Sequence, residues 1–451
     1  MSLRGSSNDM SSDSSSSEID EEDAVEVVDP TDGLRLNSAL VEEGSDAFGA
    51  SLSAVRVRPF SDRVAAVSRR AGSSGSTDMG GTFTGDTTFD QPIGLRFGSF
   101  TVLPELTING AWSDNLEQSA SGTQGTSYRI APSVAVSSDW AQHQLDLGIR
   151  GSYADDEKAG SEASQSLGAD LALRLDLNDE TTATANAAYS LARESGSSAE
   201  AGYVASDENT HQLSGNVGLK RTAGIVGVTL KGGLNRTSYE EAKSRNNTVY
   251  TLGLRTDLAT NAIATPFVEA SALTRRYDKK SASNNRNSVG YELRGGLVVA
   301  SGSKLNGEVG LGWRQEKLDS GAYDDLSGLT VDGSLVWSPS RLTTVTAGLS
   351  SSFEATTLAQ SSGSIVYAGD LRIAHGFSDR LVGDLGVGYQ LRDYQGVSID
   401  EHTITGTAGT TFALTKNAAL LTRFTQKRFL SSSAGSSYNQ STVEAGLRFR
   451  H

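Results

Sequence analysis

The sequence predicts an all-β protein: a transmembrane, antiparallel, up-and-down β-barrel of about 18 strands, within a range of 16–20, that follows a disordered N-terminal tail. Three observations predict it. Apolar and polar residues alternate with period two through most of the 451-residue chain. Turn-like clusters recur about every 40 residues, and between successive clusters lie two strand-length segments and one longer polar loop. Proline, which deletes a donor from a strand ladder, occurs only seven times.

The alternation defines each strand. Leu145, Leu147 and Ile149 fall on one face of an extended segment, whereas Asp146 and Arg150 fall on the other, because successive side chains of a strand point to opposite sides. The same reasoning predicts strands over residues 105–115, 127–138, 143–154, 163–177, 181–194, 209–221, 225–239, 246–259, 264–278, 287–300, 305–318, 326–338, 342–356, 362–376, 381–395, 399–414, 418–431 and 438–451.

One proline interrupts this pattern. Pro132 falls inside the predicted strand 127–138, so that strand is expected to be bulged, shorter or displaced. The remaining candidates, such as Pro104, Pro266 and Pro339, fall at strand ends or turns, where proline is tolerated.

A membrane barrel explains the pattern better than a soluble β-repeat. A propeller blade of about 40 residues would contain four short strands, whereas here each repeat contains two long ones. Strands of this length can cross a bilayer, and closure leaves no backbone group unpaired in lipid. Aromatic residues near the predicted strand ends are assigned to interfacial girdles: Trp140, Phe267, Trp337, Phe377 and Phe412 near short turns, and Tyr153, Tyr239, Tyr277, Phe353 and Tyr394 near long loops.

The segment before the barrel has a different composition. Residues 1–30 contain nine serines, nine acidic residues and one arginine, and such a segment cannot bury enough apolar surface to fold. We therefore predict a disordered acidic tail over 1–32, a mostly irregular periplasmic lead-in over 33–90 and the barrel over 91–451. No signal peptide is recognisable after Met1, which conflicts with the export that a membrane barrel needs.

Composition excludes several classes of protein. The absence of cysteine excludes disulfide scaffolds, thiol nucleophiles and thiolate metal sites. A net charge of −15 argues against a nucleic-acid partner. The longest apolar runs are far shorter than the roughly 18–20 residues of a spanning helix.

Two stretches resemble known sequences. Residues 93–115 resemble the opening of the putative β-barrel porin 2 family of outer-membrane proteins from Gram-negative bacteria. The resemblance would cover about 91–451, and it implies a barrel in the bacterial outer membrane. Some relatives are associated with exopolysaccharide production, which implies a role in export or at the surface. The matching positions are Gly94, Gly98, Phe100, Pro104, Asp114, Asn115, Pro132, Ser138, Asp139 and Trp140.

The C-terminus is similar to the barrel-assembly signal. Gly446 and Phe449 stand at the expected positions of this signal, but the last residue is His451 where phenylalanine is usual. The alternative is an ordinary amphipathic last strand. We expect the barrel-assembly machinery, outer-membrane lipids, lipopolysaccharide and components of polysaccharide export as partners.

No catalytic or metal site can be nominated. The histidines, His143, His211, His375, His402 and His451, show no metal-ligand spacing, and no nucleophile–base–acid set stands out. We therefore expect no cofactor and no enzymatic activity, although an outer-membrane enzyme stays an alternative.

The inner face is the remaining candidate site. A barrel of this size leaves an aqueous interior unless something fills it, and lining charges set ion preference. The sequence predicts a channel that passes hydrophilic solutes, and the family resemblance implies a place in an exopolysaccharide export pathway. The alternative is a structural or adhesive barrel without transport. The candidate pore-lining residues carry both signs: Asp146, Arg150, Asp170, Arg174, Asp176, Glu292, Arg294, Asp370, Arg372 and Asp384.

Overall fold

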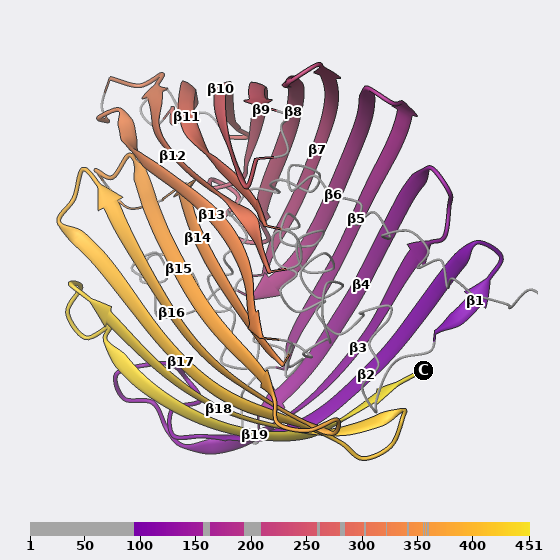
Figure 1. Ribbon diagram of the computed structural model, residues 1–451. Coiled ribbons are helices and arrows are strands. Elements are labelled where there is room, and N and C mark those ends of the chain that lie inside the picture. Colours follow the sequence, from indigo (N-terminus) through magenta and orange to yellow (C-terminus); the bar gives the residue numbers. More distant parts are fainter. Residues whose placement is uncertain are drawn as a thin grey trace, which may run out of the picture.

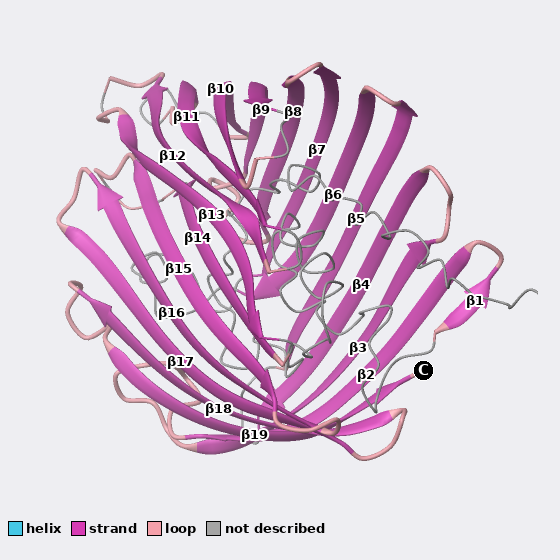
Figure 2. Cartoon of the chain, viewed as in Figure 1, coloured by secondary structure: helices cyan, strands magenta, loops and turns pink. Residues whose placement is uncertain are grey.

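The computed structural model describes residues 94–451 except 157–162, 194–208, 259–261, 280–284, 302, 303, 322, 341, 355, 357 and 359. The predicted tail and lead-in thus lie outside the described residues. Within the described ranges every regular element is a strand (Figure 2). No helix in this part of the chain is long and apolar enough to cross a membrane.

Eighteen long strands form a closed antiparallel barrel, in which each strand pairs with its neighbours in sequence and the last pairs with the first (Figure 1). A short additional strand precedes them. The elements are β1 (Leu95–Phe97), β2 (Phe100–Ser113), β3 (Gly125–Ser138), β4 (His143–Asp156), β5 (Ser164–Asn178), β6 (Thr181–Arg193), β7 (Asn209–Ala223), β8 (Val226–Tyr239), β9 (Asn247–Leu258), β10 (Ala264–Tyr277), β11 (Ser288–Ser301), β12 (Leu305–Leu318), β13 (Leu326–Ser340), β14 (Thr343–Glu354), β15 (Gly363–Gly376), β16 (Leu381–Gln395), β17 (Ile399–Ala413), β18 (Ala418–Ser431) and β19 (Tyr438–Arg450).

Closure joins β19 to β2 over nine residue pairs, from Thr442↔Ser113 to Arg450↔Glu105. Beyond the last residue of β19, β2 pairs with β1 instead, with Leu95 opposite Val102. The amide of Gly94 donates to the carbonyl of His451 at 3.1 Å, so a backbone hydrogen bond joins the two ends of the described chain. The edge that an open sheet would expose is thereby paired.

Pro132 lies within β3 without shortening it. The ladder between β3 and β2 is continuous and includes the pair Leu106↔Pro132. The ladder to β4 lacks partners for Ala131 and Pro132 and resumes at Ser133↔Arg150. The register does not shift, so the missing proline donor costs the wall only a local gap.

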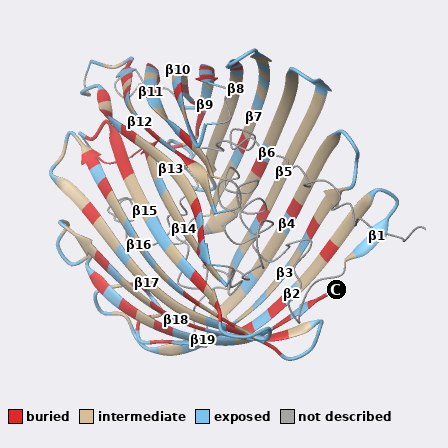
Figure 3. Ribbon diagram, in the orientation of Figure 1, coloured by how far each residue is buried: buried red, intermediate tan, exposed pale blue. Residues whose placement is uncertain are grey.

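Burial alternates along the strands (Figure 3). On β9, Tyr250, Leu252 and Leu254 are exposed, whereas Arg255 and Asp257 are buried. This is the reverse of a soluble protein, because the apolar face looks outward and the polar face looks into the barrel. The predicted alternation of apolar and polar residues is therefore confirmed, with the apolar face of each strand on the outside.

Candidate functional site

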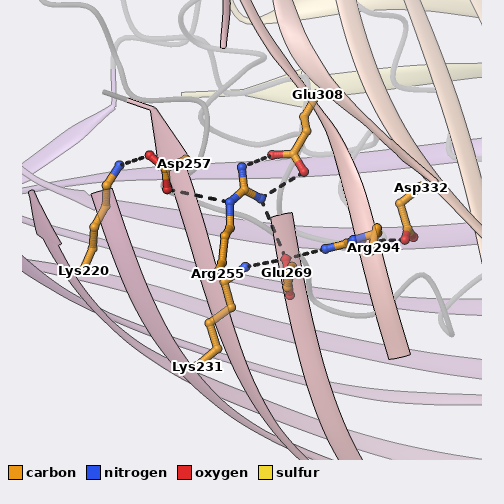
Figure 4. A network of polar contacts seen from close by, with 8 residues as sticks. All are labelled: Lys220, Lys231, Arg255, Asp257, Glu269, Arg294, Glu308 and Asp332. Carbon is orange, nitrogen blue, oxygen red and sulfur yellow. Dashed lines mark hydrogen bonds and ion pairs between the residues drawn. The ribbon is translucent and has the colours of Figure 1, made fainter. Parts of the chain in front are cut away.

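The inner face of the barrel is where the charged side chains gather. Its densest group is a network of eight residues from seven neighbouring strands, β7 to β13, which we call the charge ladder (Figure 4). The register of the sheet brings these residues together from positions more than 100 apart in sequence. The ladder contains Lys220, Lys231, Arg255, Asp257, Glu269, Arg294, Glu308 and Asp332.

Arg255 is the centre of the ladder. Its two terminal nitrogens donate to the two carboxylate oxygens of Glu308 at 3.1 and 3.0 Å, and its side chain is 0% exposed. Its guanidinium also lies 3.9 Å from Asp257 and 3.9 Å from Glu269. This bidentate geometry is specific to arginine, because a lysine ammonium offers no planar fork.

The other residues of the charge ladder continue this pairing on the neighbouring strands. Arg294 bridges Glu269 at 2.6 Å and Asp332 at 2.7 Å. Lys231 lies 3.3 Å from Glu269, and Lys220 lies 3.6 Å from Asp257. Four cations thus face four carboxylates, which leaves this sector of the wall close to neutral.

An aromatic ring supports the ladder. The guanidinium of Arg255 lies 3.8 Å from the centroid of Phe267 on β10, a cation–π distance. The ring occupies space that glycines leave open: a Cβ at Gly296 would stand 2.6 Å from ring atoms, and a Cβ at Gly310 would stand 3.2 Å away. The prediction of Phe267 as a girdle residue is therefore wrong.

The girdle prediction was also wrong for three residues near the long loops. Tyr277, Phe353 and Tyr394 are buried rather than exposed to lipid. Trp140, Trp337, Phe377, Phe412 and Tyr153 are exposed, as a girdle requires. Proximity to a strand end does not tell which face a side chain occupies: Tyr277 and Tyr394 stand at inward positions. Phe353 stands at an outward position and is buried because neighbouring strands pack over it.

A second cluster lies at the long-loop end of the barrel. Arg275 on β10 contacts Glu316 on β12 at 3.3 Å, and Ser288 on β11 donates to the same carboxylate at 2.8 Å. Arg275 also donates to the carbonyl of Phe353 at 2.7 Å. Arg314 pairs with Glu316 as well. The cluster ties four strands together where they meet the loops.

Part of the loop between β14 and β15 packs against the wall at the same end of the barrel. Leu358 is buried and packs on Tyr394, which faces inward from β16. Arg286 donates to the carbonyls of Thr356 and Leu358, the latter at 3.0 Å. Thr356 and Leu358 are thus held against the long-loop end of the wall.

All ten predicted lining residues stand at inward positions of their strands, but the structure does not bring them into one site. Six of them form separate pairs around the wall: Arg150–Asp170 at 2.8 Å, Arg174–Asp176 at 2.9 Å and Arg372–Asp384 at 3.1 Å. Only Arg294 belongs to the charge ladder. Their role in lining a conducting channel stays a prediction.

Sequence reasoning missed the other seven members of the ladder. The signal was present for some of them, because Arg255 and Asp257 alternate with the apolar residues of β9 just as Asp146 does on β4. Their mutual pairing had no signal, since it depends on the register between strands.

The three residues of the predicted assembly signal lie at the closure. A Cβ at Gly446 would stand 2.6 Å from the carbonyl oxygen of Ile108, so only glycine fits there without displacing β2. Phe449 is exposed on the outer face. The amide of His451 donates to the carbonyl of Pro104 at 3.3 Å. The signal's role in recognition stays a prediction.

Replacing His451 with phenylalanine should raise the yield of assembled barrel severalfold without changing its stability, because the substitution restores the usual last residue and leaves the backbone bonds intact. The ratio of heat-modifiable to unfolded protein on gels after expression would measure this. Leu447→Phe, on the same outward face, is the control, and equal yields from both variants would contradict the assignment.

The histidines are mostly engaged at the rim. Tyr189, His211 and Glu240 form one chain of contacts, with distances of 2.8 and 3.3 Å. Tyr389, His402 and Asp400 form a similar chain, with both distances 2.8 Å. Among the described residues no group of three or more histidine or acidic side chains could hold a metal ion.

Comparisons with known proteins agree with this architecture. Residues 89–451 match the family model described as putative beta-barrel porin 2. No curated protein sequence matches the chain.

Several solved structures are weakly similar to this chain. The outer membrane protein OpdK from Pseudomonas aeruginosa is 10% identical, with a TM-score of 0.40, over 78% of this chain and 99% of that chain. The siderophore receptor PirA from Acinetobacter baumannii is 9% identical, with a TM-score of 0.39, over 78% and 80%. The copper transporter OprC is 8% identical, with a TM-score of 0.41, over 80% and 82%.

Proposed function

This chain belongs to the putative β-barrel porin 2 family and is a porin-like β-barrel of the bacterial outer membrane, and from that premise we propose that it is a channel through which hydrophilic solutes cross this membrane. One observation carries the proposal. Eighteen strands close around a polar inner face, and a barrel of this size can enclose an aqueous path. The proposed activity is passive and involves no chemical reaction.

The charges of the inner face support weak ion selectivity. Cations and carboxylates are paired in the charge ladder and in pairs such as Arg150–Asp170 and Arg372–Asp384. Paired charges of opposite sign largely cancel their field at the distance of a passing ion. We infer that the solutes are uncharged or weakly charged polar molecules such as glycans, and exopolysaccharide export is the pathway that we propose would use them.

Planar-bilayer recording of the purified full-length protein tests the channel. We expect discrete conductance steps in KCl, with a reversal potential close to zero across a salt gradient because neither ion is strongly favoured. Heat-denatured protein is the control for detergent leakage. Conductance no greater than this control would contradict a channel.

Liposome swelling in neutral oligosaccharides tests the solute class. We expect swelling with neutral sugars at least as fast as with charged sugar acids of the same size. A structural or adhesive barrel, the alternative function, would give neither swelling nor conductance. It would instead lose surface attachment when the long loops are shortened.

A further inference from the structure

The wall of the barrel is incompletely paired at one place. β13 and β14 pair from Trp337↔Val345 to Gly333↔Leu349, with one more pair at Ser340↔Thr343, and no pair follows toward the long-loop end. The flanking strand pairs are complete at this end: β12 pairs with β13 up to Glu316↔Leu326, and β14 pairs with β15 up to Glu354↔Ser364. Residues 326–332 and 350–354 therefore border a gap in the ladder, which we call the seam.

Side chains replace the missing ladder bonds. The amide of Val331 donates to the hydroxyl oxygen of Ser351 at 2.9 Å. The hydroxyl of Tyr367 on β15 donates to the carbonyl of Leu329 at 3.0 Å. An unpaired backbone group is strongly unfavourable in hydrocarbon, which explains why polar side chains stand at this edge. Two side-chain bonds can break separately, whereas a ladder opens cooperatively.

The two sections of wall overlap at the seam. Phe353 is an even number of residues from the lipid-facing Leu349, and Ile365 is an even number from the lipid-facing Leu371. Both therefore stand at outward positions, yet their side chains are only 6% and 3% exposed. They form one apolar cluster with Leu318 and Leu326, which sit at inward positions of β12 and β13.

A glycine allows this overlap. A Cβ at Gly328, an inward position of β13, would stand 2.7 Å from the Cδ1 atom of Ile365 and 3.5 Å from the ring of Phe353. The outward face of β14 and β15 thus packs on the inward face of β12 and β13 through apolar side chains.

We propose that the seam is a lateral opening to the membrane, through which an acyl chain of a lipid in the outer leaflet inserts among the apolar side chains of the cluster behind β13. The seam lies at the long-loop end, opposite the short turns and the two ends of the described chain, which places it in the outer leaflet. An acyl chain is the ligand because the cluster directly behind the gap is apolar, and because Leu329 beside the seam is exposed on the lipid side. The proposal rests on the membrane location alone and does not require a conducting channel.

Fluorescence quenching by brominated lipids tests the opening. The chain contains no cysteine, so Leu326→Cys gives one site for a bimane label directly behind the seam. In vesicles of phosphatidylcholine brominated on its acyl chains, we expect this label to be quenched severalfold more than a label at Leu421→Cys. Leu421 is an inward residue, 1% exposed, on β18, which is paired on both sides. Equal quenching at the two sites would overturn the proposal.

Removing a polar bridge should widen the opening. Tyr367→Phe in the Leu326→Cys background is expected to raise quenching further, because it frees the carbonyl of Leu329. The matched control is Tyr389→Phe, whose hydroxyl contacts His402 on strands that are paired along their whole length. If both variants stay folded by gel heat-modifiability and Tyr367→Phe leaves quenching at the control's level, the seam is a closed wall. Bilayer conductance of the same variants reports on the channel separately.

Discussion

Replacing Gly446 with valine is expected to prevent barrel closure. A Cβ at this position would stand 2.6 Å from the Cβ of Asn109 and 2.6 Å from the carbonyl oxygen of Ile108, and neither backbone can retreat without breaking the β19–β2 ladder. Closure depends on nine residue pairs at this junction, and an open barrel would expose two unpaired edges to lipid. We expect at least a tenfold loss of folded protein in outer-membrane fractions, measured as the heat-modifiable band.

Gly406→Val is the matched control. Gly406 lies on β17, between two complete ladders, and no atom stands within 4 Å of the Cβ that it would gain. The added side chain is the same and so is its effect on backbone freedom, so the two variants differ in steric room and in the face on which the new side chain stands. Similar folded yields from Gly446→Val and Gly406→Val would contradict the steric explanation.

Replacing Arg255 with methionine should destabilise the barrel by about 3–5 kcal/mol, because it leaves the buried carboxylate of Glu308 without its bidentate partner. It also removes the cation above Phe267. Unfolding by urea in lipid vesicles, followed by tryptophan fluorescence, would measure this change in free energy. The same variant should shift the channel toward cation selectivity, because removing one positive charge gives the nearly neutral charge ladder a net negative charge.

Two further variants identify the cause. The double variant Arg255→Met/Glu308→Met should recover a large part of the loss, because removing both charges leaves no unpaired carboxylate behind. Arg96→Met breaks the Arg96–Asp139 pair, whose side chains are exposed, and should cost about 0–1 kcal/mol. If Arg255→Met lowered the free energy of unfolding no more than Arg96→Met does, the charge ladder would be unimportant for stability.

Much of the barrel could be predicted from sequence because the signal is local. Residues 305–318, 381–395 and 418–431 were predicted as strands with the bounds that β12, β16 and β18 have in the structure. A strand between lipid and a polar interior must alternate at every second residue, and each segment shows this without its neighbours. The short β1 was missed because three residues are too few to show a period.

The predicted lining residues show where local reasoning ends. Asp146 and Arg372 could be assigned to the inner face from their own strands, and so could Arg255 and Glu308 have been. That Arg255 pairs with Glu308, three strands away, could not, because the pairing follows from the stagger of β9, β10, β11 and β12.

The sequence by itself determined the strands, their two faces and their up-and-down order, because these follow from a period of two and from turns that connect adjacent segments. Only the tertiary structure decided the closure around Gly446, the charge ladder and the seam between β13 and β14. The physical reason is the same for all three. Each depends on contacts between strands that approach only when the sheet curves and closes, so no single segment carries the information.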